Sequence, residues 1–503
     1  MFSPEDFVAA LSIVGQWSVV AALAAGVSLG IVAVALPGST TATAMAVILP
    51  VSFFMDVQTG LAFLVGLYKG GIYGGSIPAI LIATPGTGAA VATILDGPEL
   101  VRAGKGRKAL DMALYSSVAG DTASDLVTVM LIVPISILVL LAGPADLAAV
   151  LLAAIVIAVL AGSGSLLRNG IMALLGLLLA TVGHDPIGYT PRLTFGIDIL
   201  ENGIPLLPML VGLFAVPEIV RLLSGNRVDD TAGLASKRAG PALAWREFWN
   251  VRKTLARSAA LGTVLGMIPG VGQPVAALLG YNVARRLSVE PGQFGRGSLE
   301  GIAAGEAANN AVNGPTLVPL LTLGIPGDKI TAVMLGAFVA HGLRPGPQLI
   351  EQEGAVILAL LLAMILANAV LLLLGKILLP VVSRLVAMPR EYLAPLVLVV
   401  AATGAFLYRS ESSDLYFMAA FGLAGIYFKR FDFDVSPMIL AFILCEGLEY
   451  ATGQTLNLAR GREFDYLFRS NPGAFVVLAL CLAVIAVVIY RKISALRNDD
   501  SCS

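Results

Sequence analysis

Long apolar runs separated by short polar stretches dominate the chain. They fall near residues 15–36, 42–54, 59–83, 122–142, 145–161, 166–182, 203–222, 255–268, 316–342, 354–382, 393–408, 415–428, 434–445 and 473–490. The longer runs reach the roughly 20 apolar residues with which a helix crosses the hydrocarbon core of a bilayer. The pattern therefore predicts an all-α, polytopic transmembrane helix bundle of about 10 to 13 spans.

Composition supports a membrane protein. Of the 503 residues, 57% are hydrophobic and 13% are charged, whereas soluble domains carry about 25% charged residues. The net charge of −1 gives no reason to expect a nucleic-acid partner. Three cysteines and two histidines, all scattered, provide neither a disulfide framework nor a metal cluster. The absence of Lys and Arg before Lys69 argues against a cleavable signal peptide.

The charged residues predict the orientation and the divisions of the chain. Residues 223–257 form a basic linker, which the positive-inside rule places in the cytoplasm. Arg491 and Lys492, at the end of the last span, place the C-terminus in the cytoplasm too. We therefore expect a first transmembrane repeat over 1–222, a second over 258–445, and a C-terminal segment with the last span over 446–503.

The two halves resemble each other. PGTGAAVATIL at 85–95 aligns with PGVGQPVAALL at 269–279, and Ala-Gly-Asp at 119–121 then falls on Ala-Gly-Glu at 304–306. We interpret this as a duplication that gives inverted repeats; the alternative is two unrelated Gly-rich membrane segments. Inversion would place the basic loops at 102–108 and 285–296 on opposite sides of the membrane, whereas their charge places both in the cytoplasm.

Two Pro-Gly motifs interrupt the apolar sequence. Proline removes a helix hydrogen bond and glycine tolerates unusual backbone angles, so each motif predicts a broken helix. Such a break persists in a membrane only where protein or a polar cavity surrounds it, and the following helix N-terminus attracts a carboxylate. The alternative is a simple kink or a turn outside the membrane. The predicted substrate-binding residues at the breaks are Thr84, Pro85, Gly86, Thr87, Gly88, Pro269, Gly270, Val271, Gly272 and Gln273.

Backbone N–H groups of Gly86, Gly88, Gly270 and Gly272, with the polar side chains of the two breaks, would bind the carboxylate. A third break, at 323–328, brings in Asp328, which we expect either to cap the next helix or to coordinate a coupling cation.

Two polar stripes accompany the breaks. On a helix over 298–313, one face carries Glu306, Asn309, Asn310 and Asn313. The first half has a similar stripe, made of Ser117, Asp121, Ser124, Asp125 and Thr128. We expect the stripes to face each other, with Asn309 and Asn310 orienting the carboxylate, and with Asp121, Glu306 and Asp328 as candidates for holding a cation or a proton. The alternative is that these groups only join packed helices.

No catalytic motif occurs in the sequence. There is no Walker-type phosphate-binding loop, no HExxH and no GxSxG. We therefore expect neither an enzyme nor a resident metal or cofactor.

The sequence resembles the large membrane subunit of the tripartite tricarboxylate transporter family. The matching motifs are YGGS at 73–76, PGTGAAVATILDG at 85–97, IPGVGQ at 268–273, FGRGSLEGIAAGEAANNA at 294–311, PLLTLGIPG at 319–327 and GLRPGPQL at 342–349. The chain departs from the family pattern at Thr84, Gly305 and Gly314-Pro315.

This resemblance implies the permease of a secondary active carboxylate transporter in the bacterial inner membrane. It implies coupling to Na⁺ or H⁺, a periplasmic solute-binding protein that delivers the substrate, and a small four-span membrane subunit as partner. We expect an elevator-type movement to alternate access. A gated anion channel or a non-transporting membrane scaffold is the alternative.

Overall fold

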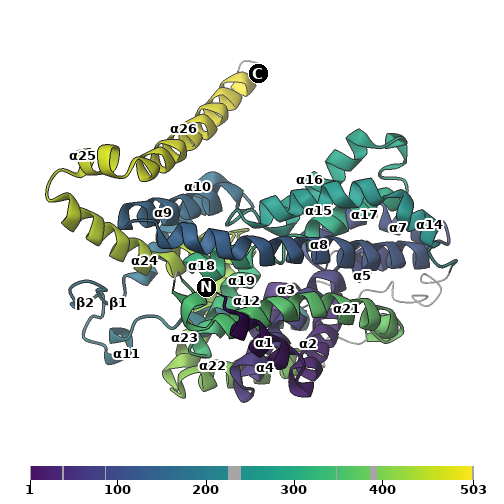
Figure 1. Ribbon diagram of the computed structural model, residues 1–503, viewed down its shortest axis with the longest axis horizontal. Coiled ribbons are helices and arrows are strands. Elements are labelled where there is room, and N and C mark those ends of the chain that lie inside the picture. The colour runs from purple at the N-terminus through teal and green to yellow at the C-terminus, as the bar shows by residue number, and fades with distance from the viewer. Residues whose placement is uncertain are drawn as a thin grey trace. The chain divides into compact units, whose positions relative to one another are not determined.

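The computed structural model describes residues 2–36, 39–84, 86–224, 240–346, 348–385 and 393–500. These residues are predominantly helical, which confirms the predicted all-α class (Figure 1). Two short antiparallel strands, β1 (Gly183–His184) and β2 (Pro191–Arg192), pair Gly183 with Arg192.

The chain forms two compact units, each with residues from both predicted halves. The first unit comprises 1–139 and 205–436, and the second comprises 140–204 and 437–503. The second unit contains β1, β2, α9 (Pro144–Ala161), α10 (Leu166–Ala180), α11 (Asp198–Glu201), α24 (Ser436–Ala459), α25 (Glu463–Asp465), the π-helical turn η6 (Tyr466–Ser470) and α26 (Pro472–Asp500).

The first unit holds all the predicted site residues. Its elements from the first half are α1 (Pro4–Val14), α2 (Trp17–Ala35), α3 (Thr41–Ile48), η1 (Leu49–Phe54), α4 (Val57–Gly74), α5 (Ser76–Ile82), η2 (Gly88–Ala90), α6 (Val91–Ile94), α7 (Gly97–Arg102) and α8 (Gly106–Leu140). Later elements are α12 (Leu206–Ser224), α14 (Trp245–Asn250), α15 (Arg252–Gly266), α16 (Gly272–Leu287), η4 (Pro291–Gln293), α17 (Leu299–Asn310), α18 (Leu317–Leu323), α19 (Lys329–Ala340), α20 (Leu349–Gln352), α21 (Gly354–Leu385), α22 (Leu393–Arg409) and α23 (Ser413–Arg430).

Apolar helices in both units are suited to a membrane. Among the described residues, four helices are long and apolar enough to cross one: Trp17–Ala35, Gly106–Leu140, Pro144–Ala161 and Gly354–Val382. Shorter apolar helices cover Thr41–Phe54, Leu166–Ala180, Lys329–Ala340, Val397–Arg409 and Pro472–Val487. Several of these follow directly on a break. The number of spans stays a prediction.

The breaks divide the first unit into two sets of helices with the same internal packing. In the first set α2 packs on α4, and Gly30 lies against the carbonyl oxygen of Leu67. In the second set α15 packs on α17, and Gly262 lies against the carbonyl oxygen of Ala308. In both sets a side chain at the glycine would overlap the backbone of the neighbouring helix.

The break after α5 is repeated in detail after α18. Ala83 and Gly324 both adopt left-handed angles, with φ of 52° and 71°. The next N–H groups turn back to corresponding prolines: Thr84 donates to the Pro78 carbonyl at 3.3 Å, and Ile325 to the Pro319 carbonyl at 3.1 Å. Thr87 and Asp328 then cap the next helices through the N–H groups of Ala90 and Thr331. The two members of every one of these pairs are separated by the same number of residues along the chain.

The two corresponding segments run in opposite directions. Tyr68 at the start of the first segment lies by Thr316, with 3.4 Å between their hydroxyl oxygens. Further along the same segment, the Ser76 hydroxyl donates to Glu306 at 2.6 Å. As the first segment advances, its partner position therefore moves backwards, which is the relation expected of inverted repeats.

The predicted alignment of the halves was wrong in its pairing. It matched 85–95 with 269–279, whereas 86–90 corresponds to 327–331. It also matched α8 with α17, yet these helices lie side by side in the same direction: Ser117 contacts Glu306, and Asp121 contacts Asn313. An alignment of short apolar motifs could not separate four similar breaks, and the earliest of these, between α2 and α3, was not recognised as one.

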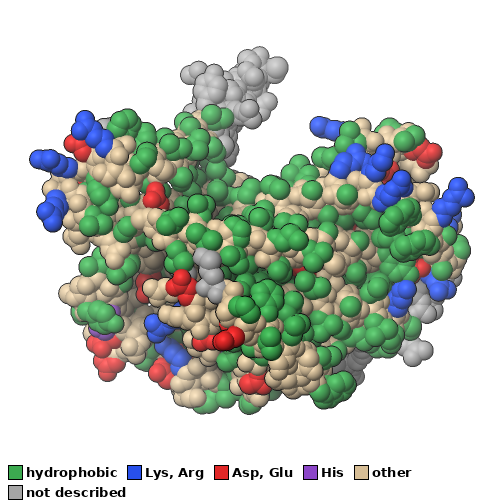
Figure 2. Space-filling view, in the orientation of Figure 1, with side chains coloured by type: hydrophobic (Ala, Val, Ile, Leu, Met, Phe, Trp, Pro, Cys, Tyr) green, Lys and Arg blue, Asp and Glu red, His purple; other side chains and the backbone are tan. Residues whose placement is uncertain are grey.

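The corrected pairing removes the conflict over the basic loops. Lys105 and Lys108 line a cavity of about 1110 Å³ together with residues 287–290 and 293, so both loops lie at one end of the unit. Figure 2 shows Lys and Arg side chains gathered over this end, near α14 to α16, and apolar side chains over the adjoining helix surfaces. Lys108 also donates to Glu247 at 2.5 Å, and this bond lowers the pKa of Glu247.

We expect Gly262→Ala to prevent folding. The added methyl group would overlap the Ala308 carbonyl oxygen, and overpacking of this kind destabilises by about 1–3 kcal/mol or more. The measurement is the yield of monodisperse protein after detergent extraction. Gly170→Ala is the matched control, because this glycine is also helical and has nothing within 4 Å of the added atom. Equal yields of the two variants would contradict the packing described here.

Candidate functional site

The two predicted Pro-Gly breaks meet. A Cβ atom placed on Gly88, where η2 begins, would lie 3.3 Å from Cγ of Pro274 in the first turn of α16. The third break joins the same place, because the Gly270 N–H donates to the Gly327 carbonyl at 2.8 Å. This N–H is therefore engaged, and its predicted role as a substrate donor is not met. The starts of η2, α16 and α19 are thus brought together.

The first break is held by its own residues. Gly86 is buried; a Cβ there would lie 2.6 Å from the Cα of Gly75 and 2.7 Å from the Val34 carbonyl oxygen. The Gly86 N–H donates to the Gly75 carbonyl at 3.2 Å, so it is already engaged, and the predicted role of this N–H as a substrate donor is not met. Thr84 is half-buried, Gly88 is exposed, and Pro85 lies outside the described residues.

The second break depends on two left-handed glycines. Gly270 and Gly272 have φ of 84° and 65°, angles that favour glycine. Pro269 and Val271 beside them are half-buried. Gln273, by contrast, is buried in the first turn of α16, and its amide nitrogen donates to Asp328 Oδ2 at 2.6 Å and to the Tyr68 hydroxyl at 2.9 Å.

Asp328 caps α19, as the first of its two predicted roles required. Its Oδ1 accepts from the N–H groups of Ile330 at 3.1 Å and Thr331 at 2.8 Å. Its Oδ2 points instead to the junction of the breaks, where it accepts from Gln273 and, at 3.5 Å, from Tyr68. Sequence reasoning missed Tyr68, because one tyrosine in a long apolar run carries no signal of its own.

Glu306 is buried on α17, and its donors among the described residues are all hydroxyl groups. Ser76 donates at 2.6 Å and Ser117 at 3.1 Å, and Thr93 is the third donor. These donors come from α5, α8 and α6, so the carboxylate joins four helices.

The asparagines of the α17 stripe have different environments. Asn310 donates to the Ser117 hydroxyl at 2.9 Å and therefore joins α17 to α8. Asn309 is 1% exposed, yet neither its side-chain oxygen nor its nitrogen has a hydrogen-bond partner among the described residues. Asn313 lies beyond the helix, which ends at Asn310 rather than at the predicted 313. An unsatisfied buried amide is costly, so Asn309 is the strongest of the three as a ligand-binding residue.

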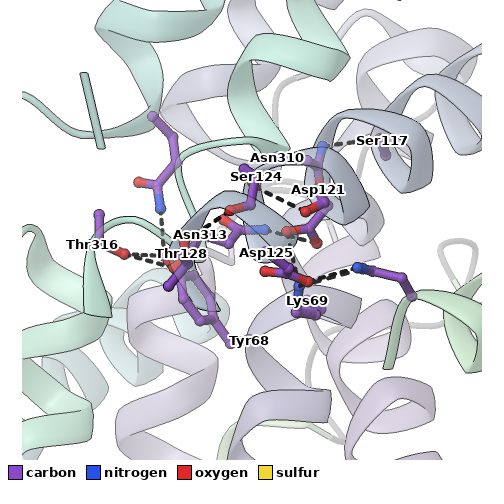
Figure 3. A network of polar contacts seen from close by, with 12 residues as sticks. Tyr68, Lys69, Ser117, Asp121, Ser124, Asp125, Thr128, Asn310, Asn313 and Thr316 are labelled. Atoms are coloured by element: carbon purple, nitrogen blue, oxygen red, sulfur yellow. Dashed lines mark hydrogen bonds and ion pairs between the residues drawn. The ribbon is translucent and has the colours of Figure 1, made fainter. Parts of the chain in front are cut away.

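The stripe on α8 faces α17, as predicted, and it also meets a lysine that was not predicted to take part. Lys69 of α4 is fully buried, with its Nζ 2.8 Å from Asp121 Oδ1 and 2.7 Å from Asp125 Oδ2 (Figure 3). Asn368 of α21 completes the cluster by donating to Asp125 Oδ2 at 2.7 Å. A lone lysine inside the apolar run at 59–83 was the available signal.

A metal site is not evident in the described part of the chain, where no three His, Cys, Asp or Glu residues are grouped to hold an ion. The arrangement offers instead a junction of helix N-termini lined by amides, beside buried carboxylates on neighbouring helices.

Comparison with known proteins gives three results. Residues 20–440 match the family described as tripartite tricarboxylate transporter TctA. The chain is 32% identical over 473 residues to an uncharacterized 52.8 kDa protein of the TAR-I ttuC' 3' region of Agrobacterium vitis, covering 94% of this chain and 93% of that protein. It is 31% identical over 238 residues to an uncharacterized protein of the TAR-II ttuC' 3' region of the same organism, covering 47% and 98% of the two chains. No solved structure matches.

Proposed function

The chain belongs to the tripartite tricarboxylate transporter TctA family, and from this membership we propose that it is the permease subunit through which a carboxylate is taken up, driven by a cation. The family is one of transporters with several subunits, and the apolar helices make the chain a multi-pass membrane protein. To the family and the multi-pass membrane character, the proposal adds the class of substrate, the coupling to a cation and the residues that bind them.

The observation that carries the proposal is the junction of the breaks. The N-termini of α16 and α19 meet there through Gly270 and Gly327. Each helix N-terminus carries a partial positive charge, which favours a carboxylate. At α19 Asp328 already caps the N–H groups of Ile330 and Thr331, so the start of α16 would supply the backbone donors. Gly88, Gly272 and Gln273 would line the anion site, with Asn309 as an additional donor from α17.

Asp328 makes a cation requirement plausible in physical terms. Its Oδ2 lies at the same junction, and a dianionic or trianionic substrate would be repelled by this carboxylate. Uptake of a positive charge with the substrate removes the repulsion. Asp328 is therefore a coupling candidate. The buried carboxylates of Asp121 and Glu306 on the neighbouring helices are the other two candidates.

The two inverted sets of helices suit alternating access, because each can adopt the arrangement of the other. We propose that one subdomain moves past the other in an elevator-type motion. The basic end at Lys105, Lys108 and residues 240–257 of the linker would face the cytoplasm; residues 225–239 of the predicted linker lie outside the described residues. A periplasmic solute-binding protein would deliver the carboxylate at the opposite face, a small four-span membrane subunit would assemble with this chain in the bacterial inner membrane, and the C-terminus would be cytoplasmic.

Uptake by proteoliposomes tests this function. The three subunits are reconstituted, and accumulation of radiolabelled succinate, malate, tartrate and citrate is followed. Accumulation against a concentration gradient that needs both the binding protein and an ion gradient supports the proposal. Flux that runs only downhill and needs no binding protein would instead identify a channel, and absence of flux would favour a scaffold.

Gln273→Leu is expected to lower the apparent affinity for the carboxylate about 10- to 100-fold, because the amide of Gln273 donates to Asp328 Oδ2 and its loss leaves this carboxylate to repel the substrate; hydrogen bonds to charged groups contribute about 1.5–3 kcal/mol. The same assay measures the effect as a rise in the half-saturating concentration. Gln293→Leu is the control, since this glutamine lies in η4 at the basic end and is exposed. An unchanged affinity in Gln273→Leu would remove this residue from the anion site.

A further inference from the structure

The Lys69 cluster holds more negative than positive charge. Two carboxylates, Asp121 and Asp125, share one ammonium group, and all three side chains are 0 or 1% exposed. The cluster carries a net charge of −1 when every group is ionised. A buried unpaired charge is costly even after local relaxation, so an additional positive charge is expected here.

The remaining neighbours of the cluster do not supply that charge. Asn313 and Asn368 donate neutral hydrogen bonds to the two carboxylates. The other titratable group facing it is Tyr68 on α4, which is neutral. The next groups, Asp328 bonded to Tyr68 and Glu306 bonded to Ser117 of α8, are acidic. Within the described residues, Lys69 is thus the only cation at the cluster.

One carboxylate oxygen is left for a proton. Asp121 Oδ1 and Asp125 Oδ1 both lack a hydrogen-bond partner in the part of the chain that the structure describes, but Lys69 Nζ forms an ion pair with Asp121 Oδ1 at 2.8 Å. Lys69 and the two asparagines contact the other two oxygens, so Asp125 Oδ1 alone has neither a hydrogen bond nor an ion pair. It lies with the Thr128 hydroxyl oxygen against Gly314, where a Cβ would be 2.7 Å from Asp125 Oδ1 and 2.8 Å from Thr128 Oγ1. The Thr128 hydroxyl donates to the Ser124 carbonyl at 2.9 Å, so its oxygen is free to accept from a protonated Asp125.

A metal ion would fit this place poorly. Na⁺ and similar hard cations need several oxygen ligands, but Lys69 Nζ already occupies the position between the two carboxylates. An ion bound there would lie beside an ammonium group and be repelled by it. A proton on one carboxylate oxygen removes the excess charge without displacing the lysine.

We propose that the cluster of Lys69, Asp121 and Asp125 carries the proton that is coupled to carboxylate uptake, an inference that rests on the proposed function. One proton binds Oδ1 of Asp125 when the cluster is open to the outside, which makes the cluster neutral. The same proton leaves from this oxygen to the cytoplasm after the carboxylate is released. No other bond is formed or broken, and one proton moves for each cycle of the cluster.

The test uses the complete reconstituted transporter with Asp125→Asn. Two processes are measured with radiolabelled succinate, malate, tartrate and citrate, in the absence of sodium: accumulation driven by an imposed pH gradient, and exchange between equal internal and external pools at equal pH. The wild type is expected to perform both. Asp125→Asn is expected to lose accumulation, so that internal and external concentrations become equal, while exchange continues because a permanently neutral cluster needs no proton.

Asp111→Asn is the matched control. This aspartate also lies on α8 but accepts from the Leu243 N–H outside the cluster, so its variant should keep both processes. Continued accumulation by Asp125→Asn would overturn the proposal, and so would wild-type accumulation that requires sodium. Absence of both processes in the wild type would overturn the proposed function itself.

A second measurement covers the possibility that Asp125→Asn does not fold. A pH-sensitive dye inside wild-type vesicles should report acidification that accompanies carboxylate uptake. Uptake without a proton entering would overturn the proposal even if no variant could be purified.

Discussion

Replacing Lys69 with methionine is expected to prevent folding, so that no folded protein is recovered from the cells. The substitution keeps a long apolar stem but leaves Asp121 and Asp125 facing each other in a buried site without their cation. Removal of one partner from a buried ion pair destabilises by about 3–5 kcal/mol, which is a large part of the stability of a typical domain. The measurement is the yield of monodisperse protein in detergent, with a fluorescent fusion to report total expression.

Two variants show whether charge is the cause. Lys376→Met removes another lysine in the first unit, but this side chain is exposed and lies 4.7 Å over the Tyr115 ring, so the yield should fall little. The triple variant Lys69→Met, Asp121→Asn, Asp125→Asn contains no charge at the cluster and should recover folded protein. If Lys69→Met alone behaves like Lys376→Met, the cluster does not contribute to folding as described.

The second large effect is expected at Asn309. Its side chain makes no hydrogen bond to the described residues although it is buried, so Asn309→Ala should cost the fold nothing. As a donor to the substrate carboxylate it should nevertheless matter, and we expect uptake at low substrate concentration to fall about 10- to 100-fold. The measurements are uptake in proteoliposomes and thermal stability in detergent.

Asn310→Ala gives the contrasting result. Asn310 holds α17 to α8 through Ser117, so its loss should lower the thermal stability of the protein, by about 0.5–1.5 kcal/mol in free energy. Normal uptake by Asn309→Ala would show that the Asn309 amide does not bind the substrate. A large loss of thermal stability in this variant would show that the amide has a hydrogen-bond partner within the protein.

The sequence predicts the breaks well and their pairing poorly. Proline and glycine constrain the backbone wherever they occur, so the interruptions at 85–86 and 269–270 could be located without a structure. Which breaks correspond depends on long-range contacts, such as those of Gly30 with Leu67 and Gly262 with Ala308. Apolar sequence carries little information about such contacts, because many residues satisfy the same lipid or protein surroundings.

The sequence predicted the part of the site whose polar residues form a periodic pattern, and missed the residues that stand alone. The stripe on α8 was visible because polar residues recur at helical spacing, and one of its two carboxylates, Asp121, was predicted as a coupling candidate. The cation that pairs with Asp121 and Asp125 was not predicted. Lys69 is a single residue more than 50 positions away, and only the fold brings α4 to α8. Tyr68 and Thr316 at the junction have no periodic pattern that would reveal them.

The duplicated architecture has a consequence for the division of labour within the molecule. The offset that relates Thr87 to Asp328 also relates Tyr68 to Asn309 and Lys69 to Asn310. Two identical copies would have carried the same residue, either lysine or asparagine, at positions 69 and 310. Such copies could not have had one position for the coupling ion and the other for the substrate. Divergence at these two pairs gives one copy the charged group and the other the amides. Under the proposed function, mutation could therefore change cation coupling in one copy and carboxylate preference in the other separately.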